Sequence, residues 1–346
     1  MIRVLVVDDS ALVRKVLSDE LSRFDDIEVV GTAPDPYVAR EKLLALNPDV
    51  ITLDIEMPRM DGLSFLAKLM EHRPTPVVIV SSVAQEHSAT AMRALALGAV
   101  EVVSKPGSAY SVPEVATTLV RAIRAAAAAK MRSPAPLMAP VVRPVPFETT
   151  TNRIVAIGAS TGGTIAIERV LRAMPAQSPG IVIVQHMPRH FTKAFADRLN
   201  TLCPMEVREA QDGDAVVPGL ALIAPGDNHM LLQRDGARYV VSVKDGPRVH
   251  HQRPAVDVLF HSVARCAGRN AVGALLTGMG IDGAKGMVAM RESGAHTIAQ
   301  DEASCVVFGM PSEAIRVGGA SEVLPLDAIG GALMEACCRR RTLATI

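Results

Sequence analysis

The sequence is poor in aromatic residues and carries no excess charge of either sign. It has no tryptophan, and Phe, Tyr and Trp together make up 3% of its 346 residues. The 36 Lys and Arg residues balance 36 Asp and Glu residues. A protein that wraps nucleic acid needs a basic excess to displace counterions, and one that stacks bases needs aromatic side chains. We therefore predict no nucleic-acid partner.

Two further absences concern the compartment in which the protein works. No uninterrupted apolar stretch approaches the ~20 residues that cross a bilayer, and the apolar run at Val4–Val7 is too short for a signal peptide. The five cysteines are odd in number and include no CxxC pair, which is typical of reduced thiols and not of a disulfide framework or a zinc site. The sequence predicts a cytoplasmic protein with no direct insertion into a membrane.

The first 125 residues alternate between short aliphatic runs and amphipathic stretches. Five strands separated by about five helices are typical of an α/β domain with a doubly wound, five-stranded parallel sheet. The predicted strands are Val4–Val7, Glu28–Val30, Val50–Leu53, Val77–Val80 and Val100–Val103, and the amphipathic stretches include Leu12–Leu21 and Val38–Leu46.

A proline-rich segment separates this block from the next. Residues 126–152 begin in an alanine run and then carry Pro134, Pro136, Pro140, Pro144 and Pro146. Proline at this density blocks helices and sheet ladders, so the segment is predicted to be an extended linker. A surface loop within one large domain is the alternative, and typical loop lengths disfavour it. The predicted domains are therefore 1–125 and 153–346.

The second block repeats the alternation and predicts a second doubly wound α/β domain. Asp235-Gly236 lies between two apolar runs and predicts a hairpin turn, so the mostly parallel sheet is expected to carry an antiparallel portion. Helices are expected after Gly162, Phe191, Val256 and Gly283. The predicted strands are Ile154–Ile157, Ile181–Val184, Leu220–Ile223, Tyr239–Val243 and Val272–Thr277, with a further run at Met230–Leu232.

Functional groups follow the predicted strands of the first block. In parallel sheets such groups gather at the carboxyl ends of the strands. Three carboxylates at one edge repel each other unless a divalent cation lies among them, and oxygen ligands favour Mg²⁺. A hydroxyl and an ammonium group would complete a phosphoryl site. Singly, an Asp at a strand end more often caps the next helix. The residues at these strand ends are Asp8, Asp9, Asp54, Ser81 and Lys105.

The first block resembles a response-regulator receiver domain of two-component signalling. The resemblance is carried by these five positions, by "LDIEMPRMDGL" around Asp54 and by the dipeptide Lys105-Pro106. The resemblance implies phosphorylation of Asp54, Mg²⁺ held by Asp8, Asp9 and Asp54, and phosphoryl binding by Ser81 and Lys105. The chain departs from many receivers at Val102, where they carry a switching aromatic residue.

The loop after Ile154–Ile157 reads Gly-Ala-Ser-Thr-Gly-Gly, which places Ser160 in a G-x-S-x-G pattern. A phosphate-binding loop and a plain helix cap are the alternatives, but the phosphate-loop patterns are absent. A serine nucleophile needs a base and an orienting carboxylate. His186 and Asp282 each follow a predicted strand, so we expect all three side chains at one edge of the sheet. Their chain order differs from that of α/β-hydrolases.

Seven motifs of the second block resemble the chemotaxis protein-glutamate methylesterase family. They read "AIGASTGG", "QHMP", "FADRLN", "IAPGDNHM", "RPAVDVLFHSVA", "LTGMGIDGA" and "DEASCVVFGMP". The resemblance implies Ser160 as nucleophile, His186 as base, Asp282 as carboxylate and the backbone amide of Met279 as an oxyanion donor. It implies no cofactor for the esterase.

The same resemblance implies a substrate and partners. The substrates are methyl-accepting chemoreceptors. Their glutamate γ-methyl esters are hydrolysed with release of methanol, and specific glutamines are deamidated to glutamate. The phosphodonor is a chemotaxis histidine kinase. The alternative is a non-enzymatic response regulator whose output domain binds DNA or a partner. It requires a helix-turn-helix or a basic face after the linker, and the sequence has neither. A stand-alone esterase would leave the first block unexplained.

Overall fold

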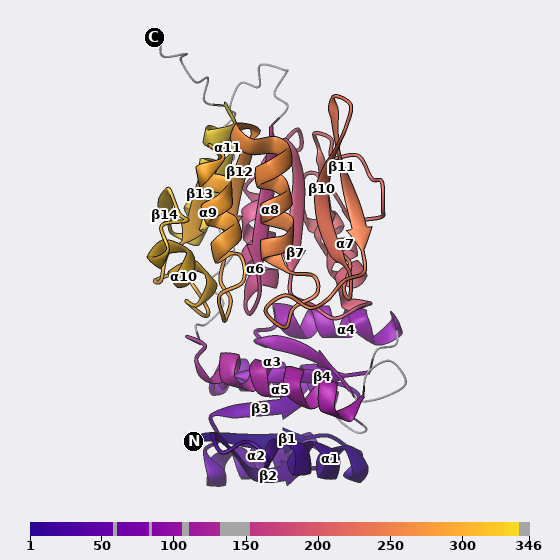
Figure 1. The fold of residues 1–346 in the computed structure, drawn as a ribbon. Coiled ribbons are helices and arrows are strands. Elements are labelled where there is room, and N and C mark those ends of the chain that lie inside the picture. The colour runs from indigo at the N-terminus through magenta and orange to yellow at the C-terminus, as the bar shows by residue number, and fades with distance from the viewer. Residues whose placement is uncertain (58–60, 83–84, 106–110, 132–152, 339–346) are drawn as a thin grey trace. The chain divides into compact units, whose positions relative to one another are not determined.

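Figure 1 shows the fold in a computed structural model of the chain. The structure describes residues 1–57, 61–82, 85–105, 111–131 and 153–338. The chain divides into two compact units. The predicted linker lies outside the described residues from residue 132 to its end, and its limits stay a prediction. In the described part of the chain, no helix has both the length and the apolar character needed to cross a membrane.

The N-terminal unit is a five-stranded parallel sheet in the order β2-β1-β3-β4-β5, as predicted. The direction of winding reverses between β1 and β3, and sheets of this kind bind ligands beside that point. The elements in chain order are β1 (Ile2–Val7), α1 (Ala11–Leu21), β2 (Ile27–Ala33), α2 (Pro36–Leu46), β3 (Val50–Leu53), α3 (Gly62–His72), β4 (Val77–Ser81), α4 (Gln85–Ala96), β5 (Glu101–Ser104) and α5 (Val112–Ala127).

Local chemistry accounts for the limits of these helices. The Ser10 hydroxyl accepts a hydrogen bond from an amide in the first turn of α1, and the Asp35 carboxylate does the same for α2. The alanine run that was expected to open the linker instead continues α5 as far as Ala127. Alanine has the highest helix propensity of all residues, which explains this extension.

The C-terminal unit contains a seven-stranded sheet and a separate hairpin. Its elements in chain order are β6 (Ile154–Ala159), α6 (Gly163–Arg172), β7 (Gly180–Gln185), α7 (Phe191–Leu202), β8 (Glu206–Glu209), β9 (Leu220–Ile223), β10 (His229–Asp235), β11 (Arg238–Lys244), α8 (Val256–Ala267), η1 (Gly268–Asn270), β12 (Ala271–Leu275), α9 (Ala284–Glu292), β13 (His296–Gln300), α10 (Met310–Arg316), β14 (Glu322–Leu324) and α11 (Leu326–Cys338).

The large sheet is parallel at every described strand pair, in the order β14-β13-β12-β6-β7-β9-β8. The predicted hairpin is confirmed: β10 and β11 pair antiparallel around Gly236, whose φ is 56°. The two strands form a sheet of their own, so the prediction that they belong to the large sheet was wrong in this respect. Strands β8, β13 and β14 were not predicted.

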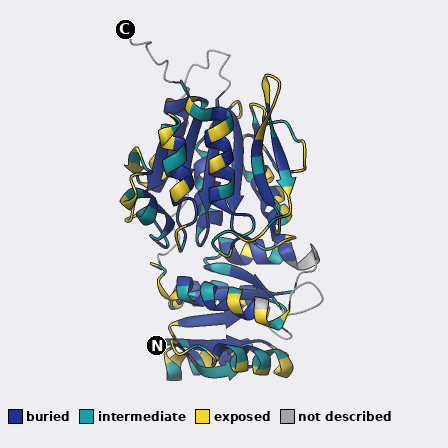
Figure 2. Cartoon of the chain, in the orientation of Figure 1, coloured by how far each residue is buried: buried dark blue, intermediate teal, exposed yellow. Residues whose placement is uncertain are grey.

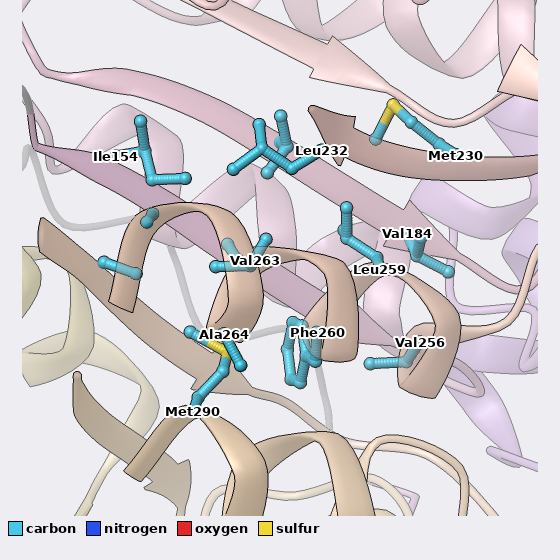
Figure 3. Close-up of a cluster of buried hydrophobic side chains, with 14 of the residues drawn as sticks. Ile154, Val184, Met230, Leu232, Val256, Leu259, Phe260, Val263, Ala264 and Met290 are labelled. Carbon is cyan, nitrogen blue, oxygen red and sulfur yellow. The ribbon is translucent and has the colours of Figure 1, made fainter. Parts of the chain in front are cut away.

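Helix α8 fills the space between the large sheet and the hairpin, and Figure 3 shows its side chains in the core. The central strands of both parallel sheets are buried, whereas the hairpin carries exposed residues and the helices alternate between buried and exposed faces (Figure 2). Burial of such apolar side chains stabilises the unit by about 1.5–3 kcal/mol each. Labelled members of this cluster are Ile154, Val184, Met230, Leu232, Val256, Leu259, Phe260, Val263, Ala264 and Met290.

Candidate active site and phosphorylation site

The candidate hydrolytic site lies where the large sheet reverses its direction of winding. From the central strand β6 the chain continues to β7 on one side, and it returns later to place β12 on the other side. The loops after β6 and β12 therefore leave the sheet side by side at its carboxyl edge, where α/β proteins bind ligands. Ser160 follows β6, and the loop that contains Asp282 follows β12.

A tight turn places Ser160 between β6 and α6. The Ser160 N–H donates to Thr277 O at 3.0 Å, which ties the serine to the loop after β12. The Gly163 N–H donates to Ser160 O at 2.7 Å and closes the turn. Gly162, with φ of 78°, precedes α6 in the left-handed region, and a Cβ there would come within 2.7 Å of the Val306 side chain. Glycine is therefore required at this position.

His186 and Asp282 form a buried pair, with His186 Nε2 2.8 Å from Asp282 Oδ2. A carboxylate can only accept hydrogen bonds, so Nε2 carries the proton of this contact in the neutral ring. Nδ1 is then the unprotonated nitrogen. It is buried, and among the described residues it has no hydrogen-bond partner. The atom that can accept a proton is therefore Nδ1.

The Asp282 carboxylate is also held by the start of α8. Oδ2 accepts a hydrogen bond from Val256 N–H at 2.7 Å, and Oδ1 accepts one from Asp257 N–H at 2.9 Å. Burial alone would raise the pKa of Asp282, but the hydrogen bond and charge of His186, together with these two amides, hold it below its ordinary value. Asp282 is therefore ionised at neutral pH and can stabilise a protonated His186.

Gln185 joins the backbone of two site residues, and the sequence analysis did not single it out. Its buried Nε2 donates to Ser160 O at 2.9 Å and to His186 O at 3.1 Å. Strands β6 and β7 pair Ala159 with Gln185, and the His186 N–H donates to Ala159 O at 3.1 Å. Ser160 and His186 thus follow directly on paired strand residues. The position of Gln185 at the end of a predicted strand, just before the histidine, is the signal that was available.

The structure brings the three predicted residues to one edge of the sheet, as the strand-end argument required. Met279 lies in the same loop as Asp282, next to Gly278, whose carbonyl accepts hydrogen bonds from Gly309 N–H and Met310 N–H at the start of α10. The role of its backbone amide stays a prediction. Of the other histidines, His229 is buried and hydrogen-bonded to Pro247 O, and His250 contacts Asp257.

The candidate phosphorylation site lies at the carboxyl edge of the N-terminal sheet. Asp8 and Asp9 follow β1 and Asp54 follows β3, and one oxygen of each lies within 4.8 Å of the others. Lys105 follows β5, and its Nζ lies 2.7 Å from Asp54 Oδ2 and 2.9 Å from Asp8 Oδ2. Three carboxylate oxygens at this spacing are the donor set that a hard divalent cation prefers, so the residues fit such an ion.

Burial raises the pKa of Asp54 above its ordinary value, although the Lys105 ammonium opposes the shift. The pKa of Lys105 is raised because hydrogen bonds and charges of Asp54 and Asp8 outweigh its own burial. The Ser81 hydroxyl, predicted to bind a phosphoryl group, lies 3.3 Å from Glu56 Oε1. That contact was not predicted. Pro106, the second residue of the predicted Lys-Pro dipeptide, lies outside the described residues.

Comparisons with known proteins give a family match for each of the two units. The CheB methylesterase family model matches residues 155–333, and the response regulator receiver domain model matches residues 4–116. Protein-glutamate methylesterase/protein-glutamine glutaminase 4 of Anaeromyxobacter dehalogenans (strain 2CP-C) is 58% identical over 336 residues, which cover 96% of this chain and 94% of that protein.

A relative from a second organism and a solved structure give the same result. Protein-glutamate methylesterase/protein-glutamine glutaminase of Escherichia coli O157:H7 is 54% identical over 330 residues, which cover 95% of each chain. The crystal structure of the Thermotoga maritima CheB methylesterase catalytic domain is similar with a TM-score of 0.53 and 39% identity, and it covers 54% of this chain and 99% of that one.

Proposed function

The chain belongs to the CheB methylesterase family, and on that premise we propose that it is a phosphorylation-regulated hydrolase. Its substrates are glutamate γ-methyl esters of chemoreceptors, which it demethylates with release of methanol, and receptor glutamines, which it deamidates to glutamate. The observation that supports this best is the buried His186–Asp282 pair, with Nε2 and Oδ2 2.8 Å apart, on strand ends adjoining that of Ser160.

The proposed reaction has two steps. Ser160 Oγ attacks the ester carbonyl while His186 Nδ1 takes the hydroxyl proton and then delivers it to the departing methanol. Water next attacks the glutamyl-serine ester, with the same nitrogen as base, and regenerates the serine and a free glutamate. Asp282 holds the ring through Nε2 and stabilises the imidazolium. The ring is thus turned relative to the chymotrypsin arrangement, in which Nε2 faces the serine. With a glutamine substrate, ammonia leaves in place of methanol.

The test of the hydrolytic mechanism is methanol release from receptor membranes that carry labelled methyl esters. Ser160→Ala removes the nucleophile, and we expect methanol release to fall to the uncatalysed rate. Ser293→Ala, at the end of α9, is a matched control that removes a hydroxyl away from the site and leaves the rate unchanged. Turnover of Ser160→Ala at the wild-type rate would exclude a covalent serine intermediate.

The N-terminal unit supplies the regulation. Asp54 accepts a phosphoryl group from a histidine kinase, and Ser81 and Lys105 bind the phosphoryl oxygens. Asp8, Asp9 and Asp54 would hold Mg²⁺, whose charge, when it is bound, would offset that of the phosphoryl group. This assignment is supported by the surroundings of Asp54, which is buried beside the carboxylates of Asp8 and Asp9 and the ammonium group of Lys105. A dianionic phosphate changes activity only if the active and inactive arrangements differ in their affinity for it.

Phosphodonor-dependent demethylation tests this regulation with the full chain. Asp54→Asn removes the phosphoacceptor, so we expect the basal rate to persist and the response to a small-molecule phosphodonor or kinase to disappear. Asp25→Asn, an exposed carboxylate of the same unit, should respond like the wild type. A full response by Asp54→Asn would place the control elsewhere. The match of the second unit to an esterase family leaves no support for a DNA-binding output domain.

A further inference from the structure

Two buried carboxylates of the C-terminal unit cap each other's helices. Helix α8 begins after Ala255 and helix α9 after Gly283, and neither residue provides a capping side chain. Asp282, just before α9, accepts hydrogen bonds from the first amides of α8. Asp257, in the first turn of α8, accepts one from Gly286 N–H in the first turn of α9 at 2.6 Å. The orientation of Asp282 therefore depends on the relative position of these two helices.

A strained turn brings an imidazole to the second carboxylate. Val249 and Gln252 pair through both of their backbone groups, at 3.0 and 2.8 Å, around His250 and His251. The two histidines have φ of 51° and 63°, a conformation that Asn or Gly usually occupies in such turns. Strain of this kind is often found near functional groups. Here it places His250 Nε2 3.1 Å from Asp257 Oδ2.

The two carboxylates are close enough to repel each other. One oxygen of Asp257, one of Asp282 and a ring nitrogen of His250 lie within 4.8 Å of one another. Burial, and then the charge of Asp282, raise the pKa of Asp257, while the amide of α9 and the imidazoles of His250 and His261 oppose the shift. Among the described residues, Asp282, His250 and His261 are the titratable groups whose charges act on Asp257. All four carboxylate oxygens already accept hydrogen bonds, so the cluster is a charge network and not an open metal site.

We propose that Asp257 is a positioning residue for Asp282 and that His250 balances its charge, so that this second imidazole–carboxylate pair adjusts the proton affinity of His186. The negative charge of Asp257 favours the protonated form of the catalytic ring, and the His250 imidazole, 3.1 Å from Asp257 Oδ2, opposes that influence whenever it carries a proton on both nitrogens. The inference rests on the proposed hydrolytic function, since it assigns His186 as the base of that reaction. It adds to the triad a pair that touches no substrate.

The test compares full-length Asp257→Asn with the wild type. Asn keeps the shape, can still accept from Gly286 N–H and can donate to His250, so the variant removes the charge and retains the cap. We expect the pH at which His186 titrates, followed by NMR of its ring, to move down by roughly half a unit or more. The acid limb of kcat for methanol release should move with it, while KM stays unchanged. An unchanged titration would reduce Asp257 to a structural cap and overturn the proposal.

His250→Asn provides a second variant with the opposite expectation. Asn suits the left-handed turn, so this protein should be at least as stable as the wild type, yet it lacks the imidazole that can take up a proton beside Asp257. We expect the titration of His186 and the acid limb to move up in pH. A shift downward or no shift would overturn the part assigned to His250. The NMR titration of the His186 ring requires no turnover. If the wild type released no methanol, the proposed function would be refuted, and the titration would still test the influence of Asp257 and His250 on His186.

Discussion

Replacement of Asp282 by Asn should damage catalysis and folding together. The carboxylate accepts three hydrogen bonds, from His186, Val256 N–H and Asp257 N–H. An amide has one acceptor oxygen and one donor group, so at least one of these buried donors loses its acceptor. If the amide nitrogen turns toward His186, the ring must move its proton to Nδ1, which is then no longer a base.

The two effects have different expected sizes. A wrong histidine tautomer lowers kcat by about 10⁴-fold in the chymotrypsin case, and we expect a loss of that order here. One unsatisfied buried donor costs about 1–3 kcal/mol. For a domain of this size each kcal/mol lowers Tm by about 2–4 °C, so Tm should fall by roughly 2–12 °C. Ser160→Ala should lose as much activity with almost no change in Tm, because the hydroxyl caps no helix.

Methanol release and calorimetry on the same preparations measure both effects, with the exposed Asp235→Asn as the matched control. A rate within tenfold of the wild type would refute the role of Asp282 in holding the ring. An unchanged Tm would refute its role as the cap of α8. The folded pKa of Asp282 is depressed, so its stabilisation is fully present above the unfolded pKa of about 3.9 and is lost as the pH falls through the folded pKa. The Tm deficit of Asp282→Asn should therefore shrink at low pH.

Two further predictions concern groups outside the site. Glu168 is buried and pairs with the partly exposed Arg172 and Arg198. Glu168→Gln should therefore lower the free energy of unfolding in urea by about 1–3 kcal/mol. An unchanged urea midpoint would show that the ion pairs add nothing to stability. Burial raises the pKa of Cys203 and Cys337 to about 12, so both thiols should resist a thiol reagent at pH 8 until the protein unfolds. Rapid reaction of the folded protein, followed by mass spectrometry, would contradict this.

The strand-end rule explains why the candidate site could be predicted from the sequence. Parallel strands present their carboxyl ends at one edge, so a hydroxyl, an imidazole and a carboxylate that follow buried runs must come near one another. Ser160, His186 and Asp282 obey this rule, and so do Asp8 and Asp54 in the first unit. The elements themselves were equally readable, because continuous aliphatic runs are typical of strands buried on both faces.

Features that depend on packing between distant segments could not be predicted in this way. Strand β14 has only three residues, two half-buried and one exposed, and no hydrophobic run, so its sequence resembles a loop. The hairpin was readable from Asp235-Gly236, but its separation from the large sheet depends on α8, which packs between the two. The turn at His250 was hidden because its residues are not those that usually form it.

The capping arrangement links stability and catalysis at particular residues. Helices α8 and α9 begin after Ala255 and Gly283, whose side chains have no oxygen to accept hydrogen bonds from the first amides. The carboxylates of Asp282 and Asp257 supply the acceptors. For α8 the acceptor is Asp282, the same carboxylate that holds His186. The amides at the start of α8 therefore also help to keep Asp282 ionised and fixed in direction. Substitution of Asp282 should then alter activity and stability together, whereas the hydroxyl of Ser160 can be removed without loss of the fold.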